Sequence, residues 1–155
     1  MAPMPNLQFL KKLSLWLSFL WMLSPVLAKA DCMNVIFGAV GRIYCLEVAD
    51  TEKTRKTGLQ GRRSLSEDGG MLFVFSDDAP RVMWMKDTLI TLDIIFLDED
   101  GVVRSMASRV SPSKIKLFSS ARYVIELAGG TVEKLDLWPG DKVSLSPSGA
   151  QKKSP

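Results

Sequence analysis

The sequence predicts a mainly β fold: a single-domain antiparallel β-sandwich or barrel of about seven or more short strands with one or two short helical inserts. Short apolar or alternating runs recur after residue 30, and turn signals rich in Gly, Pro or Asp separate them. The chain has 155 residues, of which 46% are hydrophobic and 24% charged. This length and composition are typical of one globular domain.

Residues 1–30 have the three parts of a secretory signal peptide. A front segment ends in two lysines, an apolar run follows over 13–27, and an A-x-A end at 28–30 supplies the small side chains that a signal peptidase requires. The apolar run is shorter than the ~20 residues that span a bilayer, and Pro25 interrupts it. We therefore expect cleavage after Ala30, no stable membrane span after it, and a periplasmic or secreted protein. Retention of the segment as an anchor is the alternative.

The mature chain is expected to form a single β-rich domain over 31–146. Strands are predicted over 43–49, 71–75, 81–86, 92–98, 102–110, 121–127 and 142–146. Asp50 offers an N-cap for a short helix that Gly58 ends, and a second short helix is predicted from Thr131 to Leu135. Residues 147–155 contain no apolar anchor, so we expect a disordered tail there.

Two cysteines, Cys32 and Cys45, remain after the predicted cleavage. An even pair in an oxidising compartment indicates a possible disulfide, and the spacing suits two neighbouring strands joined by a turn near Gly38 and Gly41. A half-buried thiol at Cys45 with a free one at Cys32 fits the sequence equally well. The sequence leaves both alternatives open.

Charge and residue absences exclude several function classes. The chain has 20 Lys and Arg residues against 17 Asp and Glu residues, but three lysines lie in the first thirty residues, which contain no acid. The remainder is balanced, so we expect no nucleic-acid partner. The absence of histidine excludes a Ser-His-Asp hydrolase and a histidine-ligated zinc site, and no phosphate-binding loop occurs. We predict no metal and no cofactor.

The densest polar cluster lies at the edge of the apolar centre. It combines an aromatic ring, an ammonium group, a hydroxyl group and two carboxylates, a set that suits a small polar ligand. With three further charged residues that such a site would use, the candidate ligand-binding residues are Glu47, Arg62, Trp84, Lys86, Asp87, Thr88, Asp93 and Glu126. In the structural alternative, Trp84 packs, Lys86 pairs with an acid such as Glu47 or Glu126, and Asp87 caps the turn.

The mature chain also resembles a prokaryotic family, the domain of unknown function 192 family. Five ordered segments carry the resemblance: LEVADTEKTRKTGLQGRRSL, GGMLFVF, WMKDTLITLDIIFLDEDG, ARYVIELAGGT and PGDKV. Gln60 stands where the family pattern usually has methionine, and Asp87 where asparagine is common, so both could alter the polarity of a shared site. The resemblance implies a small, often exported, β-rich protein, and it implies no activity.

Three functions from different classes follow. The leading hypothesis is an exported binding or accessory module for a small polar ligand, a sugar or envelope component, or for an envelope protein. The first alternative is a carboxylate-dependent hydrolase of envelope glycans, which would draw two acids from Glu47, Asp87, Asp93 and Glu126. The second is a structural or interaction protein that uses strand edges and has no small-molecule site. The sequence favours a non-enzymatic role, and it does not indicate the oligomeric state.

Overall fold

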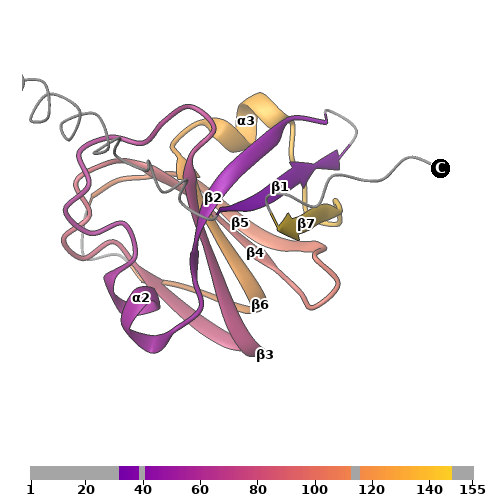
Figure 1. Ribbon diagram of the computed structural model, residues 1–155, viewed down its shortest axis with the longest axis horizontal. Helices are drawn as coiled ribbons and strands as arrows, with labels where there is room; N and C mark the ends of the chain where they lie inside the picture. The colour runs from indigo at the N-terminus through magenta and orange to yellow at the C-terminus, as the bar shows by residue number, and fades with distance from the viewer. Residues whose placement is uncertain (1–31, 39–40, 113–115, 148–155) are drawn as a thin grey trace, which may run out of the picture.

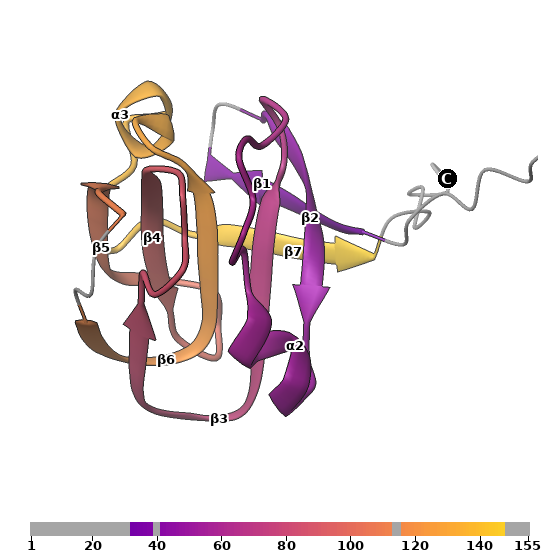
Figure 2. The same ribbon diagram turned by 90° about the vertical axis from the view of Figure 1, so that its left-hand side faces the viewer.

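The computed structural model describes residues 32–38, 41–112 and 116–147 (Figures 1 and 2). Its strands form one curled sheet of seven strands, a half-barrel, in the order β5-β4-β6-β3-β2-β1-β7. The strands are β1 (Met33–Phe37), β2 (Ile43–Ala49), β3 (Gly70–Trp84), β4 (Leu92–Leu97), β5 (Val103–Val110), β6 (Lys116–Ala128) and β7 (Val143–Pro147), and the helices are α2 (Glu52–Thr57) and α3 (Thr131–Leu135). The predicted mainly β class with short helical inserts is confirmed.

Strand β3 joins two segments that the sequence predicts as separate strands. It pairs with β6 along its whole length, and the register shifts between Val74 and Ala79. The polar residues that interrupt the apolar pattern, Ser76 and Asp77, are exposed at this irregularity. A bulge bends a strand without ending its pairing. Figure 2 shows the result: β3 and β6 curve together, which curls the sheet.

One neighbouring pair departs from the predicted antiparallel arrangement. β2 and β3 run parallel, with Glu47 opposite Met71 and Ala49 opposite Phe73. A parallel pair needs a long crossover rather than a hairpin, and residues 50–69, which include α2, provide it. The crossover places α2 at the opposite end of the curled sheet from α3 (Figure 1).

Helix α2 begins one residue later than the sequence predicts. Thr51, not Asp50, is the N-cap: its hydroxyl accepts from the backbone N–H of Thr54 at 3.1 Å, and the Thr54 hydroxyl accepts from the N–H of Thr51 at 3.0 Å. Gly58 ends the helix at a φ of 50°, as predicted. A Cβ at Gly58 would lie 3.3 Å from the Phe73 ring, so the glycine lets the helix end pack closely on β3.

Two apolar clusters lie on the two faces of the sheet. Because successive side chains of a strand point to opposite faces, β6 contributes to both: Ile125 and Leu127 to one cluster, and Val124 to the other. Glu126 follows the same alternation, and it shares the face of Val124. The fold therefore places a carboxyl group on an apolar face.

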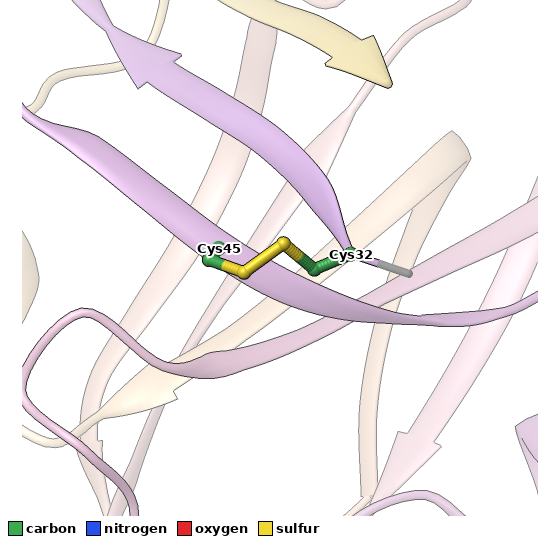
Figure 3. The surroundings of a disulfide bond; sticks show 2 residues. All are labelled: Cys32 and Cys45. Carbon is green, nitrogen blue, oxygen red and sulfur yellow. A yellow bond between two sulfur atoms is a disulfide. The ribbon is translucent and has the colours of Figure 1, made fainter. Parts of the chain in front are cut away.

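A disulfide joins Cys32 to Cys45, with a Cα–Cα distance of 5.4 Å (Figure 3). It ties the start of β1 to the middle of β2. Closing a short loop restricts the unfolded chain. Replacing both cysteines with serine is therefore expected to lower the free energy of unfolding by about 3 kcal/mol, as measured by urea unfolding. Equal stability of the double variant and the oxidised wild type would contradict this expectation.

The predicted signal peptide, residues 1–30, and residues 148–155 of the predicted tail lie outside the described residues. Within the part of the chain that the structure describes, no helix has the length and apolar character to cross a membrane. Export and signal cleavage therefore stay predictions from the sequence.

Candidate functional site

A hollow of about 430 Å³ lies at the point where β3 ends. Its wall is mostly apolar, with polar groups from one short segment and from the start of β6. The lining residues are Trp84, Met85, Lys86, Asp87, Thr88, Pro112 and Lys116. Four of the eight candidate residues thus lie together. Apolar hollows with a few convergent polar groups are typical of small-molecule sites.

Of the described residues, an indole ring and three charged side chains line the hollow. Trp84 is 44% exposed, although it is a large apolar side chain. The Lys86 ammonium lies 5.9 Å from the centre of the Trp84 ring and 3.8 Å from Oδ2 of Asp87. Lys116 of β6 is the cross-strand partner of Trp84. The hollow therefore presents an aromatic face with two cations and one carboxylate around it.

The backbone of this segment is held in an uncommon conformation. Asp87 has a φ of 57°, in the left-handed region, which aspartate and asparagine tolerate better than most residues. The carbonyl of Asp87 accepts from the N–H of Gly61 at 2.9 Å, and that of Met85 accepts from the N–H of Thr88 at 3.2 Å. Met85 is buried in the core. The hydrogen bond to Gly61 and the buried side chain of Met85 together fix this segment in place.

A second, narrow pocket of about 50 Å³ adjoins the hollow, and Trp84 and Thr88 line both. Helix α2 and the turn after it form one wall, and β3 forms another. The lining residues are Arg55, Lys56, Thr57, Gly58, Leu59, Gln60, Phe73, Val82, Met83, Trp84, Thr88 and Glu126. Glu126 is the fifth candidate residue at this site.

The carboxyl group of Glu126 lies in an apolar environment. The residue is 4% exposed, and its cross-strand neighbours are Met71 on β3 and Ile94 on β4, both buried. No described residue donates a hydrogen bond to it. Burial raises the pKa of Glu126 from its ordinary 4.5 to about 8, because an ionised carboxylate loses its hydration there. At neutral pH the group is therefore mostly a neutral acid that can both donate and accept.

Glu47 and Arg62 lie apart from both pockets. They form an ion pair with each other, with 2.6 Å between the Arg62 guanidinium and Oε2 of Glu47, and both side chains are well exposed. Glu47 stands in the same cross-strand row as Glu126, but Met71 lies between them. Exposed pairs of this kind contribute about 0–1 kcal/mol to stability, and this one brings no group to the hollow.

Asp93 has a structural position and faces neither pocket. It is fully buried, and its Oδ1 accepts from the backbone N–H of Arg109 at 2.7 Å and of Gly130 at 2.9 Å. Its Oδ2 accepts from the N–H of Val132 at 2.7 Å. Since its neighbour Ile94 shares the face of Glu126, Asp93 points to the opposite face. The carboxylate holds the start of α3 against β5.

Several residues of the two pockets carry no signal in the sequence. Lys116 and Leu59 reach the site through the pairing of distant strands and the crossover, which local patterns do not reveal. Gln60, which departs from the family pattern, lies on the same wall as Leu59. Among the described residues, no group of three or more His, Cys, Asp or Glu side chains is arranged to hold a metal ion. The site thus consists of one aromatic face, two pockets and one buried acid.

The comparisons with known proteins agree with this fold. A protein of Sinorhizobium meliloti 1021, described as a proposed transcription regulator, has 36% identity and a TM-score of 0.67, with 74% of this chain and 92% of that chain covered. A protein of unknown function from Novosphingobium aromaticivorans has 31% identity and a TM-score of 0.67, with 73% and 83% covered. No curated protein matches the chain. The family model described as "Uncharacterized ACR, COG1430" matches residues 35–145, so the chain belongs to the domain of unknown function 192 family.

Proposed function

We propose that the protein is an exported binding module that takes a small polar ligand, a sugar or a component of the cell envelope, in the hollow beside Trp84. The observation that carries the proposal is the gathering of Trp84, Lys86, Asp87 and Thr88 around one mostly apolar hollow of about 430 Å³. The signal-peptide pattern of residues 1–30 and the Cys32–Cys45 disulfide support a periplasmic or secreted location.

The groups around the hollow suit a sugar ring. An exposed indole offers a flat apolar surface on which the C–H face of a pyranose can stack. Lys86, Lys116 and Asp87 stand around this surface and supply donors and acceptors for ring hydroxyls. Such a combination recognises a molecule with one apolar face and several polar edges.

Hydrolysis of a glycan has less support than binding. A glycosidase of the usual kind needs two carboxyl groups on either side of the scissile bond. Glu126 has the raised pKa of a general acid, but of the described residues that line its pocket it alone carries a carboxyl group. Glu47 pairs with Arg62, and Asp93 is bound by backbone N–H groups. Asp87 lies in the adjoining hollow, with its Oδ2 3.8 Å from the ammonium group of Lys86. We therefore favour a ligand-binding role.

The description of the Sinorhizobium relative as a proposed transcription regulator raises DNA binding as another function. Binding of DNA depends on an excess of basic groups that neutralise phosphates. After residue 30 the chain has equal numbers of basic and acidic residues, which does not favour that function. A sugar needs no such excess of charge.

A thermal-shift screen of the purified mature protein tests the proposal, with sugars, envelope fragments, amino acids and metal ions as probes. A ligand at a hundred times its dissociation constant stabilises the fold by about 2.7 kcal/mol, which raises the melting temperature measurably. We expect Trp84→Ala and Lys86→Ala to abolish the shift. Arg62→Ala, on the exposed ion pair, is the matched control and should keep it. A shift that survives Trp84→Ala, or no shift from any probe, would contradict the proposal and favour a protein partner.

A further inference from the structure

Glu126 is a buried polar group that the fold itself does not use. Buried polar groups in proteins are almost always hydrogen-bonded, and leaving one unpaired is costly. Glu126 is 4% exposed, has two apolar cross-strand neighbours, lines the narrow pocket, and receives no hydrogen bond from any described residue. An apolar residue of similar size would satisfy the packing better. We therefore expect the carboxyl group to have a role other than stabilising the fold.

The pocket of Glu126 and the hollow beside Trp84 share part of their lining. Trp84 and Thr88 belong to both walls, so a ligand in the hollow lies next to the mouth of the narrow pocket. The hydroxyl-bearing side chain of Thr88 is buried and lines both pockets. Thr88 thus lies where the hollow meets the pocket of Glu126.

The size of the narrow pocket limits what can enter. Its volume is about 50 Å³, whereas that of the hollow is about 430 Å³. Because the narrow pocket is far smaller than the hollow, it suits a small substituent, whereas the hollow suits a ring. A ligand that uses both spaces would place its ring in the hollow and one polar substituent against Glu126.

The charges around the pocket favour an uncharged substituent. Arg55 lines the pocket, but its guanidinium donates to the carbonyl of Val74 at 2.8 Å and lies 5.2 Å from the centre of the Phe75 ring. Lys56 is exposed on α2, and Gln60 donates to its carbonyl at 3.2 Å. Among the residues that the structure describes, no cation is thus held against Glu126 to keep it ionised. An ammonium group would have to displace the proton of the acid and lose its own hydration, whereas a hydroxyl group can accept from the neutral acid and donate to it.

We propose that Glu126 binds one hydroxyl group of a pyranose sugar whose ring stacks on Trp84, and that Thr88 lies at the junction of the two contacts. This inference rests on the proposed function, because it assigns a sugar to the hollow. It adds a second recognition point, buried and specific for a neutral hydroxyl group, to the exposed aromatic face.

Calorimetric titrations with the mature protein test this assignment. The probes are the methyl pyranosides of glucose, galactose, mannose and N-acetylglucosamine, followed by the single-deoxy analogues of the best binder. We expect one deoxy analogue to bind about tenfold more weakly, as loss of a buried hydrogen bond implies. Glu126→Leu should weaken the parent sugar by about the same factor and leave that analogue unchanged. Glu126→Gln, which keeps a donor and an acceptor, should bind within a few-fold of wild type.

Each result separates this inference from the proposed function. Sugar binding that requires Trp84 but is unchanged in Glu126→Leu and Glu126→Gln would overturn the role of Glu126 and leave the binding module intact. Tighter binding of an amino-sugar analogue, lost in Glu126→Gln, would overturn the neutral hydroxyl in favour of a cation. If none of the sugars binds, both are overturned. Circular dichroism of each variant establishes that it folds, and Glu126→Gln preserves the shape of the side chain if Glu126→Leu does not fold.

Discussion

Replacing Glu126 with leucine is expected to stabilise the fold, and the gain should grow by about 5 kcal/mol between pH 4 and pH 9. Burial raises the pKa of Glu126 from 4.5 to about 8. Between these values the unfolded chain ionises at this residue while the folded chain stays protonated, so the wild type loses about 1.4 kcal/mol of stability for each pH unit. Leucine does not titrate, so the variant escapes this loss. Urea unfolding of both proteins across this pH range measures the difference.

The sign of the pH effect follows from the direction of the pKa change. Below pH 4.5 Glu126 is protonated in both the folded and the unfolded wild type, so the protein has its full stability there. The free energy of unfolding falls as the pH rises above 4.5, and the loss is complete once the pH has passed through 8. Glu126→Gln is the matched control. Its stability should depend on pH as little as that of Glu126→Leu, but it should lack the stability that leucine gains by burying an apolar side chain. A wild type as stable at pH 8 as at pH 5, relative to both variants, would contradict the burial of an unpaired acid.

Replacing Asp93 with alanine is expected to lower the free energy of unfolding by about 3 to 5 kcal/mol. The change leaves the backbone N–H groups of Arg109, Gly130 and Val132 without the carboxylate that accepts from them. Buried donors without acceptors carry their full desolvation cost. Urea unfolding of the variant measures the effect.

Asp93→Asn and a variant of the exposed Glu47–Arg62 pair are the controls for Asp93→Ala. Asp93→Asn keeps one acceptor oxygen and should therefore be less destabilising than alanine. Removing one partner of the exposed Glu47–Arg62 pair should cost less than about 1 kcal/mol. A loss for Asp93→Ala no larger than the loss for Arg62→Ala would show that the carboxylate does not hold α3.

Local patterns predicted most elements of this fold. The alternation of residues 43–49 corresponds to β2, and the expected helix from Thr131 to Leu135 is α3. Two features depend on distant pairing and were missed. The bulge between Val74 and Ala79 keeps β3 continuous because β6 supplies partners on both sides of it. The parallel β2–β3 pair depends on the path of the crossover, which no local pattern specifies.

The candidate site was predictable where its residues are adjacent in the chain. Trp84, Lys86, Asp87 and Thr88 line one hollow largely because one short turn carries them all. Asp87 stands where asparagine is common in the family pattern. The backbone accommodates this difference, since both residues tolerate a φ of 57°. The place of Glu126 beside this turn, in contrast, depends on the curl of the whole sheet. Only the structure brings the two together.

Nuclear magnetic resonance can show whether the hollow beside Trp84 and the pocket of Glu126 form one ligand site. The ¹⁵N-labelled mature protein would be titrated with the methyl pyranoside that binds best in calorimetry. We predict saturable shifts in the amide signals of Trp84, Lys86, Thr88 and Glu126 and in the Trp84 indole signal, with the amide of Glu47 unaffected. No saturable shift, or shifts confined to residues around Glu47, would contradict a shared ligand site.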